Sequence, residues 1–317
     1  MSTSSKPSGA NSAERSPHVA CVVLNWNGWR DTQVCLDALK QCEYEPLTVI
    51  VVDNGSTDGS VKHLQDSHPW VRLLQTGANL GFSGGCNVGI RTALNISADY
   101  IWLLNNDTVP ASSALAELVF TAELDKTAGA IGSVMSYLQN PNEIQAWGGG
   151  RVNIFTGRTI HAHSPQSDEW FDYLTAASVL LRRAAVEEIG LFDEEFFLYW
   201  EDTDYSYRLR TAGWKLRVSR SASILHKEHG STDRDISVLQ RHTIESGFRF
   251  LRKHSPVPRL SITIFFLRKI IRALSNKDRA HIHEVLSAFR RSKRARQNIN
   301  SIQNQRFPSD QENTLTR

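Results

Sequence analysis

The sequence contains no apolar run that approaches the about 18 residues a helix needs to span a bilayer. Residues 1–17 are rich in Ser, Pro and Asn and lack the apolar segment of a secretory signal, so we expect a disordered tail there. Residues 297–317 are polar and rich in Gln and Asn, which predicts a second disordered tail. Hydrophobic residues still make up 40% of the 317 residues, and the mean hydropathy is −0.34. These values predict a soluble globular protein with a sizeable core.

Cysteine is scarce, and its spacing fits neither a disulfide scaffold nor a metal site. The chain has four cysteines, no CxxC pair, and apolar or small residues around each thiol. We therefore expect reduced, buried thiols in a cytoplasmic protein. The four are Cys21, Cys35, Cys42 and Cys86.

Charge is distributed unevenly along the chain. Residues 252–296 contain 13 Lys and Arg against two acids, a local net charge of +11, whereas the complete chain carries only +3. The remaining residues therefore sum to −8. A basic segment on an acidic body suggests an anionic neighbour, either a membrane surface or a nucleic acid.

The first hundred residues alternate between strand and helix patterns. Short β-branched or apolar runs at 22–24, 47–52, 71–74 and 99–104 predict four buried strands. Segments with helical spacing at 29–41, 60–67 and 87–95 separate them, as in βαβ units. Polar residues follow the carboxyl ends of these strands, the edge at which open α/β sheets bind ligands. We therefore expect an α/β fold, with a helix near 183–189 and further helices from about residue 257.

Two polar segments in this first part favour nucleotide binding without establishing it. Asp53 ends a buried strand and could accept hydrogen bonds from a base or ribose, although an Asp-Asn-Gly turn explains its neighbours equally well. Four glycines between 81 and 89 precede a helix, where backbone amides can hold phosphate. No G-x-G-x-x-G fingerprint follows the first strand, so a dinucleotide site is not expected.

Three further segments carry candidate chemistry. Asn106 and Asp107 end the fourth strand with oxygen ligands suited to a hard divalent ion, or form a plain polar turn. Glu201 and Asp202 are crowded among aromatic residues, which raises carboxyl pKa values as a general base requires, or they begin an acidic helix. His226 could bind metal or contact a diphosphate, although most single histidines do neither.

The order of these segments is more specific than any one of them. From residue 19 to residue 251 the series resembles the family 2 glycosyltransferases, and most closely the rhamnosyltransferase-type enzymes of bacterial polysaccharide assembly. The segments that carry the resemblance are Leu24-Asn25-Trp26-Asn27, Val52-Asp53-Asn54-Gly55-Ser56, the stretch from Asn79 to Asn87, Asn105-Asn106-Asp107, Glu201-Asp202 and His226.

The resemblance implies a GT-A fold, a Rossmann-like mixed sheet flanked by helices with a C-terminal helical extension. It divides the chain into a glycosyltransferase domain at 18–251, with a nucleotide-binding half at 18–107 and an acceptor half at 108–251. A basic amphipathic helical extension at 252–296 follows. This extension could contact a membrane surface, pack on the domain with a solvated basic face, or form a homodimer contact.

The resemblance also assigns roles to individual residues. Asp202 is the expected base, with Glu201 orienting it or the acceptor. Asp107 and His226 are the expected contacts of Mg²⁺ or Mn²⁺. Many relatives have two acids in the metal motif, whereas this chain has Asp107 after two asparagines. The nucleotide-sugar contacts are Asn25, Trp26, Asp53, Asn79, Gly84, Asn87 and Asn106, and the acceptor side is lined by Trp147, Gly148 and Trp200.

The implied reaction is an inverting transfer from a nucleotide diphosphate sugar to a hydroxyl of a cell-surface polysaccharide or lipid-linked glycan. Deoxythymidine diphosphate rhamnose is the first candidate donor, with UDP-hexoses, UDP-galactofuranose and GDP-sugars left open. We expect action in the cytoplasm or at the inner membrane face.

Three rival readings stay open. A non-catalytic sugar-nucleotide-binding scaffold on the same fold is one, although it would not be expected to keep the whole set of acids and His226. Nucleic acid is not an expected partner, because the basic residues alternate with apolar ones and no binding motif is visible. A nucleotidyltransferase would need a phosphate-binding loop near the first strand, which residues 25–30 do not provide.

Overall fold

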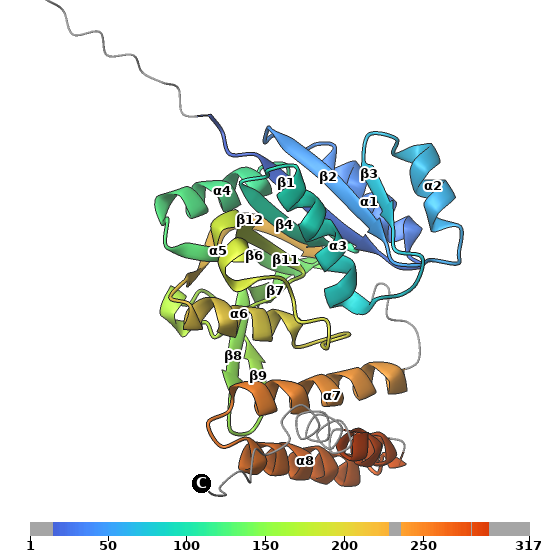
Figure 1. The fold of residues 1–317 in the computed structure, drawn as a ribbon, viewed down its shortest axis with the longest axis vertical. Helices are drawn as coiled ribbons and strands as arrows, with labels where there is room; N and C mark the ends of the chain where they lie inside the picture. The colour runs from blue at the N-terminus through green and yellow to red at the C-terminus, as the bar shows by residue number, and fades with distance from the viewer. Residues whose placement is uncertain (1–14, 228–235, 280, 292–317) are drawn as a thin grey trace, which may run out of the picture.

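The computed structural model of the chain describes residues 15–227, 236–279 and 281–291 (Figure 1). The predicted tails at 1–17 and 297–317 lie outside these residues, except for 15–17. Within the described residues a nine-stranded sheet has the order β3-β2-β1-β4-β11-β6-β12-β5, with β7 paired to β6. Its strands are β1 (Val19–Asn25), β2 (Leu47–Asp53), β3 (Arg72–Gln75), β4 (Tyr100–Asn105), β5 (Thr108–Pro110), β6 (Ala128–Tyr137), β7 (Asn140–Trp147), β11 (Ser178–Arg182) and β12 (Lys215–His226).

A small second sheet and a set of helices complete the fold. The small sheet has the order β10-β8-β9. Its strands are β8 (Gly149–Asn153), β9 (Arg158–His161) and β10 (Tyr173–Leu174). The helices are α1 (Trp29–Leu39), α2 (Ser60–Ser67), α3 (Gly81–Asn95), α4 (Ala114–Leu124), α5 (Arg183–Ile189), α6 (Glu201–Thr211), α7 (Ile236–His254) and α8 (Pro258–Ser275), with a short 3₁₀ turn η1 (Asp168–Trp170) and a last helical segment at 281–291.

The first half of the main sheet is parallel, as the alternating pattern predicts. β3, β2, β1 and β4 pair in parallel, and their register places Asn25 opposite Asp53 and Leu24 opposite Asn105. The polar residues after these strands therefore share one edge of the sheet, as expected. This arrangement confirms the predicted α/β class.

The second half makes the sheet mixed. β11 is antiparallel to both β4 and β6, β12 is parallel to β6, and β5 is antiparallel to β12. β6 and β12 share the most extensive pairing, although they are separated by the hairpins and helices between residues 138 and 214.

Helices cover both faces of the sheet, and side chains of β1 alternate between two cores. Val19, Cys21 and Val23 pack with α1, α2 and α4 on one face. Ala20 and Val22 pack with α3, α5 and α6 on the other face. The four cysteines are free thiols, and Cys42 is the half-buried one.

Helix α3 begins at Gly81 rather than at Asn87, where the sequence pattern placed it. Its glycines let the helix approach the sheet closely. A Cβ atom at Gly85 would lie 2.4 Å from Cδ1 of Leu24, and one at Gly89 would lie 2.2 Å from Cγ1 of Val22. Close packing against β1 therefore accounts for these two glycines.

A third core lies between helix α6 and the C-terminal helices. It joins Phe196 and Trp200 with side chains of α7, α8 and the segment 281–291. α7 continues to His254, so the domain boundary expected after Leu251 falls inside a helix. No helix in the described part of the chain is long and apolar enough to cross a membrane.

Candidate active site

The carboxyl ends of β1 and β2 hold Asp53 in a hydrogen-bonded frame. Asn25 Nδ2 donates to Asp53 Oδ1 over 2.8 Å, and the Ser56 amide donates to Asp53 Oδ2 over 3.0 Å. Protein donors therefore occupy both carboxylate oxygens of Asp53, which is only 2% exposed. The strand-end carboxylate predicted to contact a base is thus fixed in position by its neighbours.

The same frame extends to the end of β4. Thr32 Oγ1 donates to Asn25 Oδ1 over 2.8 Å, and Asn106 Nδ2 donates to Thr32 Oγ1 over 2.9 Å. Thr32 therefore links Asn106 to Asn25, and through Asn25 to Asp53. All three of these residues were predicted to contact the nucleotide-sugar. Sequence reasoning missed Thr32, because a lone threonine in a helix gives no signal of its own.

Two loops border this frame. Asn79 Oδ1 accepts hydrogen bonds from Asn54 Nδ2 over 3.1 Å and from the Gly81 amide over 2.9 Å. In the other loop, the Asn27 amide donates to Ser56 Oγ over 2.8 Å. Trp26, just before it, is half-buried. These contacts hold the residues that follow β1, β2 and β3 against one another.

Two of the residues that were predicted to contact the nucleotide-sugar pack against other protein groups. Asn87 is 1% exposed; its Nδ2 donates to the Phe192 carbonyl and to Glu194, and its Oδ1 accepts from the Phe192 amide. Gly84 is buried, and a Cβ there would lie 2.7 Å from Cβ of Leu80. In this structure Asn87 holds the loop before α6 on α3, and a direct donor contact by either residue stays a prediction.

Asp107 and His226 lie together, as predicted. His226 Nε2 is 3.2 Å from Asp107 Oδ1, but the atoms lack the alignment of a hydrogen bond, and Oδ1 is buried without a hydrogen-bond partner. His226 Nδ1 lies 2.6 Å from Gln145 Oε1. Because an amide oxygen only accepts, Nδ1 carries the proton and the Nε2 of a neutral ring presents its lone pair to the carboxylate.

This arrangement fits a divalent cation. Two facing lone pairs, one of them on a buried and unsatisfied carboxylate oxygen, repel each other unless a cation lies between them or the ring is protonated. Within the described residues no three His, Cys, Asp or Glu side chains gather as a protein-only metal site. Asp107 and His226 therefore suit an ion that takes its other ligands from a bound diphosphate and water.

Glu201 and Asp202 begin α6; Glu201 is buried and Asp202 is half-buried. Burial, followed by the neighbouring Asp202, raises the pKa of Glu201, whose Oε2 is buried without a partner. Burial also raises the pKa of Asp202, although the amide and hydroxyl of Thr203 oppose this effect by donating to Oδ1. The pair has the raised pKa values expected of a general-base site.

A backbone segment connects this pair to the end of β4. The Ala176 amide lies within 3.4 Å of Asp202 Oδ2, and the Ala177 carbonyl accepts from the Asn105 amide over 2.9 Å. Asp202 and the Asn105–Asp107 turn thus lie on opposite sides of the same short segment.

The chain enters α6 through strained backbone. Tyr199 and Trp200 have φ values of 66° and 70°, in the left-handed region that bulky residues rarely adopt. Such strain persists only where the surroundings enforce it, and it is found preferentially at functional sites. Here packing enforces it: the Trp200 indole is buried against Phe250 and donates through Nε1 to the Thr243 carbonyl over 3.2 Å.

The three residues predicted on the acceptor side therefore differ in their surroundings. Trp200 belongs to the core under α6, and its contact with an acceptor stays a prediction. Gly148 is buried, and a Cβ there would lie 2.4 Å from Cγ2 of Val218. Trp147 is half-buried, and its Nε1 has no hydrogen-bond partner. Among the three, Trp147 is thus the one whose ring donor is left unpaired, and that Nε1 atom is itself buried.

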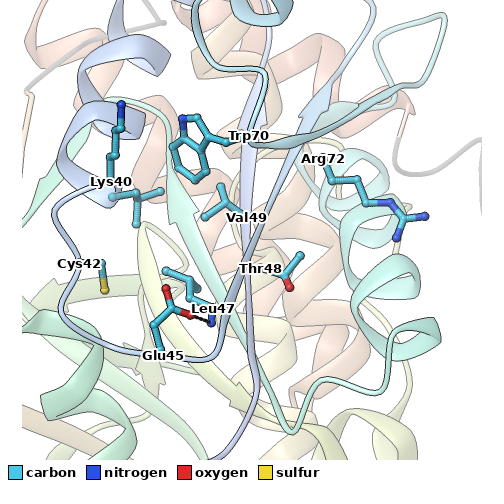
Figure 2. Close-up of a pocket in the computed structure, with 9 residues that line it drawn as sticks. Lys40, Cys42, Glu45, Leu47, Thr48, Val49, Trp70 and Arg72 are labelled. Atoms are coloured by element: carbon cyan, nitrogen blue, oxygen red, sulfur yellow. Dashed lines mark hydrogen bonds between the residues drawn. The ribbon is translucent and has the colours of Figure 1, made fainter.

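A pocket lies away from all of these residues (Figure 2). It has a volume of about 320 Å³ and lies between the end of α1 and the beginnings of β2 and β3, so it opens at the amino-terminal edge of the sheet. Trp70, Lys40 and Val49 line it, and none of the predicted site residues does. It is not part of the candidate active site.

Sequence and structure comparisons identify the family. The family model "Glycosyltransferase like family 2" matches residues 17–242. The N-acetylglucosaminyl-diphospho-decaprenol L-rhamnosyltransferase of Mycobacterium tuberculosis is 30% identical over 246 residues, 69% of this chain and 80% of that protein. The galactofuranosyltransferase GlfT1 of Mycolicibacterium smegmatis is 26% identical over 66% of this chain and 70% of its own length.

Solved structures agree on the fold. The mannosyltransferase PcManGT of Pyrobaculum calidifontis, in complex with GDP-Man and Mn²⁺, superposes with a TM-score of 0.56 at 16% identity, over 89% of this chain and 76% of its own. GalNAc-T7 with UDP, GalNAc and Mn²⁺ gives a TM-score of 0.63 at 14% identity, over 78% of this chain and 49% of its own. These similarities support the predicted GT-A fold. The chain belongs to the family 2 glycosyltransferases and is a glycosyltransferase, as its ordered motifs predict.

Proposed function

We propose that the chain transfers a sugar, with inversion, from a nucleoside diphosphate donor to an acceptor hydroxyl. The observation that carries this proposal is the segment 176–177, which contacts Asp202 on one side and the end of β4 on the other. This segment thereby links the half-buried Asp202 carboxylate at the start of α6 to the turn that holds Asp107 after β4. The hydrogen-bonded frame around Asp53, at the carboxyl end of β2, is the proposed binding site for the nucleoside part of the sugar donor.

The donor contacts we propose follow from this frame. Asn25 and Asn106 orient the loops that follow β1 and β4, and Asp53 faces the nucleoside from the end of β2. Trp26 offers a ring against the base, where stacking contributes roughly 1–3 kcal/mol. Asn79 lies at the entrance to α3, toward the diphosphate.

Asp107 and His226 are the residues that would hold Mg²⁺ or Mn²⁺. A divalent ion held there would supply positive charge against the diphosphate leaving group. The support is the partnerless Asp107 Oδ1 and the lone pair of His226 Nε2, and two of the structural neighbours were solved with Mn²⁺. Gln145 keeps the His226 ring in the required tautomer.

Asp202 is the proposed base. It takes the proton of the acceptor hydroxyl, whose oxygen forms the new bond to the anomeric carbon while the bond from that carbon to the diphosphate oxygen breaks. The electron pair leaves with the nucleoside diphosphate. Glu201 orients Asp202 or the acceptor. A single displacement of this kind inverts the anomeric configuration.

The identities that we propose for the donor sugar and the acceptor are inferred from the relatives. A relative named as an L-rhamnosyltransferase acting on N-acetylglucosaminyl-diphospho-decaprenol favours deoxythymidine diphosphate rhamnose and a lipid-linked glycan acceptor. The similar proteins also include galactofuranosyltransferases and a complex with GDP-Man. UDP-galactofuranose and GDP-sugars are therefore the next candidate donors. A lipid-linked acceptor in turn places the enzyme at a membrane surface, which we propose to be the cytoplasmic one.

Calorimetric binding of UDP, dTDP and GDP, each with Mn²⁺, Mg²⁺ or a chelator, tests the donor class. We expect one nucleotide to bind tightly and only with metal. Failure of all three to bind would reject the enzymatic proposal and favour a non-catalytic scaffold on the same fold. Turnover of the matching donor, followed by NMR of the anomeric proton in the product, then tests inversion.

A further inference from the structure

The outer face of α8 exposes a stripe of large apolar residues. Leu260, Leu267, Ile271 and Leu274 are between 49% and 61% exposed, whereas Phe265 and Ala273 on the opposite face are buried. At 3.6 residues per turn, the four exposed positions fall within one narrow sector of the helix. A continuous apolar stripe of this kind on a helix surface indicates a contact with something apolar.

Basic side chains flank the stripe. Arg268 and Arg272 are exposed on one side of it, and Arg259 is exposed on the other. They belong to the segment 252–296, whose net charge of +11 contrasts with −8 on the remaining residues. An apolar centre with cationic flanks matches a helix that lies in the headgroup region of an anionic bilayer.

Two other occupants fit this surface less well. A two-fold dimer through the stripe would bring the same arginines of both copies together, and their like charges would oppose association. A nucleic acid would meet the arginines but also four exposed aliphatic side chains, with no aromatic stacking platform among them. The pattern of charge therefore selects the lipid surface.

The inner face of α8 relates this surface to the active site. Phe265 packs edge-on to the Trp200 indole, with ring centroids 6.4 Å apart, and Trp200 directly precedes Glu201 and Asp202. Figure 1 shows α7 and α8 as a layer beneath α6 and the rest of the domain. Since a helix with its side chains is roughly 10 Å across, the base lies on the order of one to two helix diameters from the stripe.

We infer that the stripe Leu260–Leu267–Ile271–Leu274 and its flanking arginines dock the enzyme on an anionic lipid surface. Docking holds the start of α6 at a fixed height above the headgroups. The role of this surface in presenting a lipid-linked acceptor rests on the proposed function, whereas lipid binding itself does not.

Flotation of the full chain with phospholipid vesicles tests the inference. We expect binding to vesicles that contain phosphatidylglycerol, little binding to pure phosphatidylcholine, and loss of binding at high salt, where charges are screened. The double variant Leu267→Glu/Ile271→Glu should weaken binding by about tenfold or more, because it removes two inserted side chains and adds two repelled charges. Arg259→Glu/Arg272→Glu should weaken binding to anionic vesicles only.

The matched control is Phe120→Glu/Leu124→Glu on α4, which alters two apolar residues that are at least as exposed, on a helix at the other end of the molecule in Figure 1. Its vesicle binding should equal that of the unaltered chain. The inference is overturned if the chain does not bind anionic vesicles, if the α8 variant binds as well as the control, or if light scattering shows a dimer that the α8 variant dissociates.

Nucleotide binding in solution separates this inference from the proposed function. If nucleotide binds with metal but vesicles do not, only the lipid surface is rejected. If vesicles bind but no nucleotide does, the lipid surface stands and the transfer reaction is rejected.

Discussion

At the level of single side chains, the active-site proposal depends first on Asp202. We expect Asp202→Asn to lower kcat by about a thousandfold or more, because proton transfer to a positioned base contributes typically 10²–10⁴-fold. Nucleotide affinity should change little, since Asp202 contacts Thr203 and Ala176 and not the strand-end frame. Activity assays and calorimetry on the same variant measure the two effects. Equal loss of turnover and nucleotide binding would contradict the assignment of Asp202 as base.

The pH dependence of activity follows from the burial of the same carboxyl group. Burial raises the pKa of Asp202 above its usual value of 3.8. Because the base must be deprotonated to accept a proton, kcat/KM should fall as the pH drops through this raised pKa. The acid limb of the pH profile should therefore lie at a higher pH than an ordinary aspartate gives. A limb near the usual value in the unaltered enzyme would contradict this view.

Gln145 is predicted to act through His226. Replacement by Leu removes the acceptor that keeps Nδ1 protonated, so metal-dependent nucleotide binding should weaken by about tenfold to a hundredfold, as is typical of partners that orient a metal ligand. Gln145→Glu retains an acceptor and should restore most of the affinity. Calorimetric titration with Mn²⁺ provides the measurement. Unchanged metal dependence in the Leu variant would show that Gln145 does not position the ring.

How far single site residues can be predicted from sequence depends on what else their side chains contact. Asp107 and His226 lie together as predicted, and Asp53 ends its strand as predicted. Asn87 and Trp200 carry the same motif signal, yet their polar atoms are used by Phe192, Glu194 and Thr243. A motif indicates that a residue type is required at a position, but not whether its side chain contacts a ligand or another part of the protein. Gln145 has no motif at all and is found only through its contact with His226.

At the level of helices and strands, the close approach of α3 to β1 gives a stability prediction. Gly89→Ala should lower the free energy of unfolding by about 1–3 kcal/mol, because its new Cβ would overlap Cγ1 of Val22. Val22→Ala removes that methyl group, so the double variant should lose less than the sum of the two single variants. Urea unfolding of the four proteins measures this coupling. If the two changes in the free energy of unfolding were strictly additive, contact with Val22 would not be the reason that position 89 requires glycine.

The strands were easier to predict than the helix that they pack against. Buried parallel strands read as unbroken apolar runs, and the patterns at 22–24 and 47–52 fall within β1 and β2. The helix was instead expected to begin only at residue 87, after most of the glycines of 81–89, and glycine does disfavour an isolated helix by roughly 1 kcal/mol per residue. Tertiary contact overrides this propensity here, because α3 can approach Leu24 and Val22 only without side chains at Gly85 and Gly89.

For the complete chain, local patterns indicate the fold class but not the order of the strands in its second half. The alternating first half can form little else than a parallel sheet. By contrast, β11 enters between β4 and β6, and β12 pairs with β6 across a long stretch of intervening chain. Such pairings depend on which apolar faces remain uncovered after the first half has folded. Packing on the domain was one of the alternatives left open for the amphipathic C-terminal region, and its inner face completes the core beneath Trp200.

The C-terminal layer therefore ties stability and activity together. Phe265 on α8 is buried against Trp200, Phe248 and Gly247. We expect Phe265→Ala to reduce the free energy of unfolding by about 3–5 kcal/mol. It should also lower kcat more than it weakens nucleotide binding, because Trp200 leads directly into Glu201 and Asp202. Thermal unfolding, steady-state kinetics with a soluble acceptor and calorimetry measure these effects.

Leu267, two residues further along α8, provides the matched comparison. It is 49% exposed on the outer face, so Leu267→Ala should leave both stability and kinetics in solution nearly unchanged. The two variants remove large apolar side chains from the same helix and differ in which face they alter. If both proved equally harmless, α8 would be an appendage that the active site does not need. If Phe265→Ala alone impairs turnover, the helix that we propose to rest on lipid also supports the backbone that presents the base.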